Sequence, residues 1–186
     1  ADKRYHLKCQ LGVSTTTGDA EGEVTESQDV SAITESDIKA VLPAFLGEIE
    51  QVPPMYSALK HNGERLYKLA RQGIEVERKA RKVTIYEIEF ISYSLDEQQR
   101  SILELEVSCS KVTYVRTLVE DIAKKLDCGS HITELRRLSV GPYDGDMFTI
   151  KQLSKLAEKG EAALDACLQP VDSGVADWPD VHLTAD

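Results

Sequence analysis

The sequence lacks long apolar runs and closely spaced cysteine pairs, and each absence excludes a class of protein. No apolar run approaches the roughly 18 residues that a membrane-spanning helix needs, and the opening stretch from Ala1 to His6 lacks the apolar core of a secretory signal. The chain has only four cysteines, none in a Cys-x-x-Cys pair: Cys9, Cys109, Cys128 and Cys167. A disulfide framework is therefore not indicated, and we expect a cytoplasmic protein with no membrane partner.

Motifs that hold a metal or a cofactor are missing as well. There is no glycine-rich loop of the kind that cradles phosphates. Cys128 and His131 are two candidate metal ligands, but two ligands do not complete a tetrahedral site. A buried thiol is the simpler interpretation of Cys128. We expect neither a metal nor a cofactor.

Charge is distributed unevenly along the chain, whose net charge is −10. Between Pro54 and Lys82 there are eight basic and three acidic residues, a local charge of +5, so the rest of the chain carries −15. Polyanion binding depends on the local field and not on the total. This basic segment, with Tyr56 and Tyr67 in it, fits an RNA-facing element, although a solvated helix face explains the pattern equally well.

Hydrophobic periodicity predicts an α+β fold with a mixed, largely antiparallel sheet flanked by helices. Apolar residues alternate over 4–13, which is typical of a half-buried strand. Two longer strands are expected over 82–93 and 101–109, as an antiparallel pair. A helix over 113–126 has one apolar face, and a further strand is expected over 131–140. The order of strands and helices does not repeat, which favours α+β over βαβ units.

Local signals predict where several elements begin and end. Thr34 and Asp37 have the spacing of a capping box, and Pro43 should shorten the helix that follows. A strand over 56–60 should enter a tight turn at Asn62-Gly63. Gly129 should end the helix over 113–126.

Five motifs, in order along the chain, resemble those of the bacterial TruB-type tRNA pseudouridine synthase family. They cover roughly residues 3 to 150. They are the KRY of Lys3 to Tyr5 followed by the loop Thr15 to Gly22, the EQVPPMYSALK of Glu50 to Lys60, the LYKLARQG of Leu66 to Gly73, the SKVTYVRTL of Ser110 to Leu118, and the CGSHITELRRL of Cys128 to Leu138.

The resemblance implies a fold, a reaction and a partner. Residues 1–160 would be part of a pseudouridine synthase-like catalytic domain, with a mobile RNA-binding insertion over 54–82. Residues 161–186 would be a C-terminal helix and tail that lead to a further RNA-binding domain. The reaction would convert uridine to pseudouridine at position 55 in the T loop of tRNA. The target base would be flipped out, attacked by a carboxylate, rotated and rejoined through carbon. The partner would be the T-arm of tRNA, bound by a monomer.

The resemblance also implies roles for individual residues. Tyr5 would stack on the target base and serve as a general base, Arg116 would pair with the nucleophilic carboxylate, and Leu135 would line the base pocket. Without the resemblance, the three would be a sheet aromatic, an exposed helix charge and a core leucine. RNA contacts are implied at Asp19, Tyr56, Lys60, Arg65, Lys68, Arg71, Lys111 and Tyr114. Asp19 would bond the flipped nucleotide, although an Asx-turn also explains it.

The sequence departs from the family pattern at one decisive point. The family carries its catalytic aspartate in a GHTGxLDPxAxG motif upstream of KRY, and the 186 residues contain no such motif. We therefore expect this chain alone to have no synthase activity. Two smaller departures are Thr16, where the family has Asp, and Val112, where it has Gly. Val112 is tolerable only if the backbone there does not need a positive φ.

Other functions are compatible with parts of the sequence. A non-catalytic RNA-binding or tRNA-chaperone module would use the basic insertion alone. An acidic α+β interaction domain would have no RNA role, and salt-dependent RNA binding would exclude it. The archaeal and eukaryotic relatives that are guided by RNA are a further alternative, although the segment lengths favour the bacterial branch.

Overall fold

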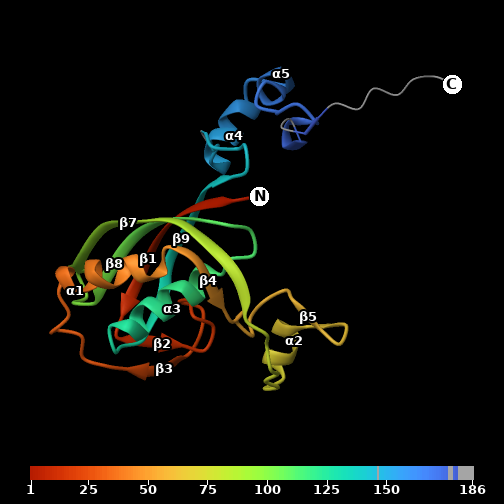
Figure 1. Cartoon of the computed structure of the whole chain (residues 1–186). Helices are drawn as coiled ribbons and strands as arrows, with labels where there is room; N and C mark the ends of the chain where they lie inside the picture. The colour runs from red at the N-terminus through yellow and green to blue at the C-terminus, as the bar shows by residue number, and fades with distance from the viewer. Residues whose placement is uncertain (146, 176–177, 180–186) are drawn as a thin grey trace. The chain divides into compact units, whose positions relative to one another are not determined.

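The chain folds into two compact units, which the computed structural model in Figure 1 describes for residues 1–145, 147–175 and 178–179. The first unit is Ala1–Leu138 and the second is Ser139–Asp186. Of the helix and tail expected over 161–186, residues 176–177 and 180–186 lie outside the described residues. The first unit contains the sheet, the basic insertion and most of the residues to which the sequence assigned a role.

A five-stranded sheet organises the first unit in the order β4-β7-β8-β1-β9. The strands, in that order, are Gly47–Gln51, Arg81–Leu95, Ser101–Cys109, Lys3–Leu11 and Ser130–Val140. The pairs β4–β7, β7–β8 and β1–β8 are antiparallel. This confirms the predicted α+β class and its antiparallel sheet.

One face of the sheet is covered by two helices, α1 (Glu35–Val41) and α3 (Val115–Lys125). Apolar side chains of β1 and β8, such as Leu7 and Leu105, are fully buried there and share one core with Ile38 and Leu118. Their alternation along the strands follows from the twofold side-chain period of a strand. The residues of β1 that point to the other face are charged or polar, at Arg4, His6, Lys8 and Gln10.

The capping box at the start of α1 is confirmed. The Asp37 backbone N–H donates to Thr34 Oγ1 at 3.3 Å, and the Thr34 backbone N–H donates to Asp37 Oδ2 at 2.9 Å. Pro43 lies in a 3-10 turn, η1 (Leu42–Phe45), directly after α1. Proline lacks the N–H that a longer helix would use at this point, so the helix stops where the sequence indicated.

The basic insertion is built from β5 (Lys60–His61), β6 (Glu64–Arg65) and α2 (Leu66–Arg71). Figure 1 shows β5 and α2 away from the sheet, beside the ends of β4 and β7. The Asn62-Gly63 turn is confirmed, because both residues have positive φ, at 50° and 87°. The strand expected over 56–60 is wrong except for Lys60. Residues 55–58 form bends, in which the Ser57 N–H donates to the Met55 carbonyl at 2.9 Å.

Helix α3 ends differently from the expectation. Its last helical residue is Lys125, and Asp127 takes the positive φ of 55° that was expected of Gly129. Gly129 instead makes a close approach to β2 (Val13–Thr15), where an added Cβ would lie 2.0 Å from Ser14 Oγ. A short antiparallel ribbon of β2 and β3 (Val24–Ser27) follows β1.

The second unit contains α4 (Ile150–Ala157), α5 (Glu161–Asp165) and a short 3-10 turn, η2 (Ser173–Val175). A capping box between Thr149 and Gln152 begins α4. Among the described residues, no helix of either unit is long and apolar enough to cross a membrane.

Candidate functional site

Arg116, in the first turn of α3, joins three segments that are distant in sequence. Its Nη1 donates to Asp19 Oδ2 at 2.9 Å and to the Thr17 carbonyl at 2.9 Å. Its Nη2 donates to the Tyr56 carbonyl at 2.8 Å. The guanidinium is therefore fixed between the loop that follows β2, the start of the basic insertion, and its own helix. We call Arg116, Asp19 and the Thr17 and Tyr56 carbonyls the arginine cluster.

The Asp19 carboxylate is oriented by its own loop. Asp19 Oδ1 accepts hydrogen bonds from Thr17 Oγ1 at 2.6 Å and from the Glu21 N–H at 3.2 Å, which leaves Oδ2 for Arg116. The loop is tied to β9, because the Ile132 N–H donates to the Gly18 carbonyl at 3.0 Å. The predicted Asx-type turn at Asp19 is thus present, and the same carboxylate also forms an ion pair.

Gln51 anchors the beginning of α3, a role that the sequence did not suggest. Its side chain is 2% exposed and forms two hydrogen bonds with the backbone of Tyr114. Oε1 accepts from the Tyr114 N–H at 2.8 Å, and Nε2 donates to the Tyr114 carbonyl at 3.1 Å. Gln51 ends β4 and Tyr114 precedes Arg116 by two residues, so this pair fixes the helix start on which Arg116 stands.

Glu120 lies one helical turn after Arg116, beneath the Asp19 loop. A Cβ added to Gly18 would lie 2.7 Å from Glu120 Oε1, which shows how closely the loop covers this carboxyl group. Burial raises the pKa of Glu120 above its ordinary value, whereas Lys124 opposes the rise. The side chains of Arg116 and Asp19 are themselves only 24% and 30% exposed, so their ion pair is partly shielded from water and stronger than one in bulk water.

Tyr5 and Leu135 belong to neighbouring strands of the sheet, β1 and β9. Burial raises the pKa of the Tyr5 phenol, Cys109 adds to the rise, and the charge of Arg137 opposes it. Leu135 is 48% exposed and is not a core leucine. The hydrogen bonds among the described residues join Arg116 to Asp19 and Tyr56 but not to Tyr5.

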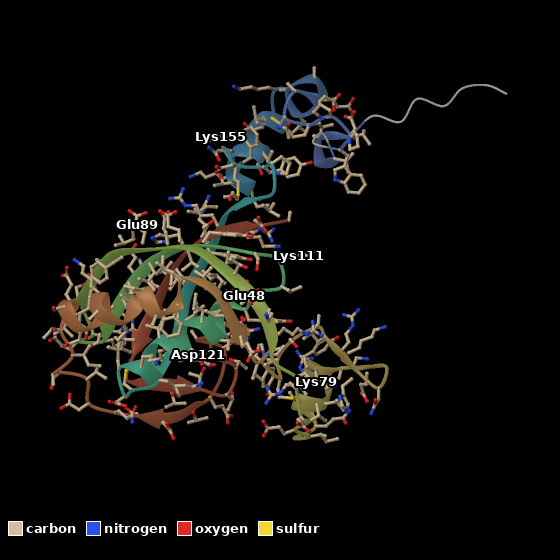
Figure 2. The ribbon with its side chains drawn as sticks, viewed as in Figure 1. Glu48, Lys79, Glu89, Lys111, Asp121 and Lys155 are labelled. Carbon is tan, nitrogen blue, oxygen red and sulfur yellow. The ribbon has the colours of Figure 1, made fainter. Side chains whose placement is uncertain are left out.

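The cations of the basic insertion are directed to solvent. Six of its eight cations are exposed and take part in no ion pair within the described ranges: Lys60, Arg65, Lys68, Arg71, Lys79 and Arg81. Leu66 and Leu69 are buried and hold α2 in place. The guanidinium of Arg71 lies over the Tyr67 ring at 5.5 Å. Figure 2 shows the nitrogen-tipped side chains of this segment, around the labelled Lys79.

Lys111 and Tyr114 precede α3, in the segment that leads from β8 to the arginine cluster. Lys111, labelled in Figure 2, is exposed, and Tyr114 is partly buried. Val112, between them, has a φ of 64°. We expected valine to be tolerated there only if the backbone did not need a positive φ, and this condition is not met. A left-handed backbone is unfavourable for a β-branched residue.

Val112→Gly should increase the free energy of unfolding by about 1 kcal/mol, because glycine adopts positive φ without a steric penalty. Urea denaturation measures the change. Val24→Gly is the matched control: Val24 is exposed in β3, and its replacement should lower stability. A Val112→Gly midpoint below that of the parent protein would contradict the strain that we assign to Val112.

The residues that the structure describes contain no group of three or more histidine, cysteine, aspartate or glutamate side chains placed to hold a metal ion. Cys9, Cys109 and Cys128 are buried free thiols. The Cys128 side chain is thus in the environment of a small apolar residue, in agreement with its interpretation as a buried thiol.

Comparison with known proteins gives two family matches, which together cover most of the chain. The model for the TruB family pseudouridylate synthase N-terminal domain matches residues 1–115. The model for the tRNA pseudouridylate synthase B C-terminal domain matches residues 116–176.

Curated bacterial relatives match over nearly the whole chain. The tRNA pseudouridine synthase B of Nitrosococcus oceani is 53% identical over 187 residues, which is 100% of this chain and 59% of that protein. The enzyme of the same name from Ectopseudomonas mendocina is 54% identical over 96% of this chain and 57% of its own length. The chain thus spans less than two thirds of these relatives.

Solved structures confirm the fold. A chain of a Cbf5-Nop10-Gar1 complex matches with a TM-score of 0.62 and 25% identity, over 94% of this chain and 43% of that one. A chain of an H/ACA RNP bound to a substrate RNA matches with a TM-score of 0.60, over 94% of this chain and 42% of its own. Its identity of 22% supports a likeness of fold alone.

Proposed function

The chain belongs to the TruB family of pseudouridylate synthases, and we propose that it acts in the isomerisation of uridine to pseudouridine at position 55, in the T loop of tRNA. Membership of the family supports the reaction. The observation that carries the proposal for this chain is the arginine cluster. It presents a fixed guanidinium beside an insertion whose cations are free to contact RNA.

The chemistry requires a carboxylate nucleophile and a cation that keeps it ionised and oriented. A guanidinium has five N–H donors. Asp19, Thr17 and Tyr56 engage three donors of Arg116 among the described residues, so two remain for a second carboxylate. An ion pair with Arg116 would lower the pKa of that carboxyl group and hold it in one orientation. Asp19 would thus act through Arg116, in addition to any contact with the nucleotide.

The proposed sequence of steps needs no cofactor. The carboxylate attacks C1′ of the flipped uridine and displaces N1 of the base, so that an ester bond replaces the N-glycosidic bond. The freed base rotates, its C5 attacks C1′, and the carboxylate leaves again. N1 takes up a proton from solvent. The proton on C5 is then lost, and Tyr5 is the proposed acceptor or relay for it. Because burial raises the pKa of Tyr5, the phenol is protonated at neutral pH, so it can take the C5 proton only if it passes its own hydroxyl proton to another acceptor. The charge of Arg137 would favour the phenolate in such a relay. Leu135 would line the pocket for the base.

The nucleophile itself would come from a segment outside these 186 residues, which contain no Leu-Asp-Pro sequence. The proposed division of the chain is a partial catalytic domain over 1–160, with 54–82 as the mobile RNA-binding insertion. A monomer is proposed, as the resemblance implies. The reaction would take place in the cytoplasm, where tRNA is modified.

Release of tritium from tRNA labelled at C5 of uridine tests the proposal directly, because C5 exchanges hydrogen for carbon in the reaction. The full-length encoded protein should release tritium from a tRNA transcript, and the 186-residue chain alone should not. A transcript with cytidine at position 55 is the control and should give no release. Equal release from both transcripts would contradict the assigned position, and no release from either would contradict the reaction.

The non-catalytic alternative is favoured by one observation, the free cations of the insertion. Lys60→Ala with Arg71→Ala should weaken tRNA binding by about tenfold at moderate salt and leave single-turnover kcat nearly unchanged, because phosphate contacts supply affinity and not chemistry. The slope of log K against log salt should fall by about 1.4 to 1.8 for two lost contacts. Filter binding over a salt series measures both quantities.

Lys124→Ala with Lys125→Ala is the matched control, because it also removes two charges, at the far end of α3. This double variant should bind like the parent protein. If the Lys60 and Arg71 variant lost turnover and affinity equally, the proposed division between binding and catalysis would be wrong.

A further inference from the structure

A cavity of about 370 Å³ lies at the base of the insertion, apart from the arginine cluster. The residues that line it come from both ends of the insertion, at 53–66 and 77–81, and include neither Arg116 nor Asp19. Its volume is at the lower end of the range for small-ligand pockets. A single unstacked nucleotide is of this size class, whereas a base-paired helix cannot enter such a cavity.

The floor of the cavity is apolar. It is formed by Pro53, Leu59 and Leu66, of which Leu66 is only 3% exposed and is fixed by its place at the start of α2. The Leu66 N–H donates to the Leu59 carbonyl at 2.8 Å, so two of these residues are held together by the backbone. A flat aromatic base is the part of a nucleotide that gains most from contact with such a surface.

The rim of the cavity is cationic. Lys60, Lys79 and Arg81 are exposed there and form no ion pair within the part of the chain that the structure describes, and Glu77 is the acidic residue in the lining. His61 adds a further donor. Free cations around an apolar floor match a ligand with a planar base and a phosphate at its edge.

Arg78 keeps the two walls of the cavity together. Its Nη1 donates to the Pro53 carbonyl at 3.2 Å, and its Nη2 donates to Glu75 Oε1 at 2.9 Å. The bond to Pro53 ties the two ends of the insertion together at the cavity, and the bond to Glu75, within one end, orients the guanidinium. Arg78 Nε is buried and has no hydrogen-bond partner among the described residues.

We propose that this cavity binds one unpaired nucleotide of the RNA substrate, distinct from the uridine that is isomerised. The base lies on the floor of Pro53, Leu59 and Leu66, and its phosphate contacts Lys60, Lys79 and Arg81. The inference rests on the proposed function, because it takes the same RNA as its ligand. It assigns specificity to a second nucleotide, which must be free of pairing to reach the cavity.

The test combines two protein variants with a set of abasic RNAs, using the full-length protein and a T-arm hairpin. Each unpaired loop position except the target uridine is replaced in turn by an abasic nucleotide. With the parent protein, one position should weaken binding by about five- to 150-fold, which is the size of a lost base stack. With Leu59→Asp, the intact hairpin should bind as weakly as that abasic RNA, and the abasic change should have no further effect.

Lys79→Glu with Arg81→Glu gives an independent measurement, because both side chains are exposed and their reversal does not disturb the core. This variant should bind the intact hairpin at least about tenfold more weakly than Lys124→Ala with Lys125→Ala. The inference is overturned if the effects of Leu59→Asp and of every abasic position on affinity simply add. It is also overturned if Lys79→Glu with Arg81→Glu binds the hairpin as tightly as Lys124→Ala with Lys125→Ala. If the full-length parent protein did not isomerise uridine but one abasic position still coupled to Leu59→Asp, the proposed function would be contradicted and the cavity assignment supported.

Discussion

Arg116→Lys in the full-length protein should lower kcat by about 10² to 10³ and change tRNA affinity by less than about threefold. Lysine retains the charge but not the planar set of donors, so it cannot bond Asp19, Thr17 and Tyr56 at once and still meet a second carboxylate. Single-turnover tritium release gives kcat, and filter binding gives the affinity.

Arg71→Lys is the matched control for this exchange. Arg71 is an exposed cation of the insertion, and a point charge is sufficient for a phosphate contact, so kcat should be unchanged. If Arg116→Lys retained full turnover, Arg116 would be only a structural link between loop and helix. If it lost affinity as strongly as kcat, its role would be in RNA binding.

Gln51→Leu should lower the free energy of unfolding by about 1 to 3 kcal/mol, because it leaves the Tyr114 N–H without its partner, whereas the Tyr114 carbonyl keeps the Leu118 N–H at 3.1 Å. It should also lower kcat, since Arg116 stands two residues along the same helix start. Urea denaturation gives the stability, and tritium release gives kcat. Gln98→Leu, in the exposed loop between β7 and β8, is the control and should change stability by less than about 0.5 kcal/mol.

Gln51→Glu separates a positioning role from plain packing. The new carboxylate can still accept from the Tyr114 N–H, but it faces the Tyr114 carbonyl and cannot donate to it. Protonation restores the donor, so the folded state favours the protonated form and raises the pKa of the new carboxyl group. Stability is then recovered as the pH falls below that pKa and lost as the pH rises through it. A stability difference from the parent protein that did not change with pH would contradict this account.

The elements that the sequence predicted correctly depend on short-range patterns. The capping box at Thr34, the Asn62-Gly63 turn and the alternation of β1 each lie within a few residues, where spacing alone is informative. The strand expected over 56–60 failed because Pro53-Pro54 and the bends after them redirect the chain toward α2. Tertiary contact there prevailed over the β-type composition.

The site was less accessible to sequence reasoning, because its contacts join distant segments. Arg116 and Asp19 are 97 positions apart, and Gln51 and Tyr114 are 63 positions apart. Motif resemblance identified Arg116 and Asp19 as important but did not pair them with each other. The contacts at Tyr56 and Tyr114 involve backbone atoms, whose role no residue type reveals. Opposite charges in a loop and at a helix start were the available signal for the ion pair.

Two arginines hold carbonyl groups of the same four-residue stretch, Arg78 at Pro53 and Arg116 at Tyr56. The stretch is thus held by a hydrogen bond from Arg78 of the insertion at one end and by one from Arg116 of α3 at the other. An RNA that displaced the Tyr56 carbonyl would remove one of the hydrogen bonds that hold Arg116, and would so change the free-energy difference between this orientation of the guanidinium and others. Thermodynamic linkage makes this effect reciprocal: the factor by which RNA favours one arginine orientation equals the factor by which that orientation favours RNA. A substitution that changes the preferred orientation of the guanidinium should therefore also change the affinity for RNA.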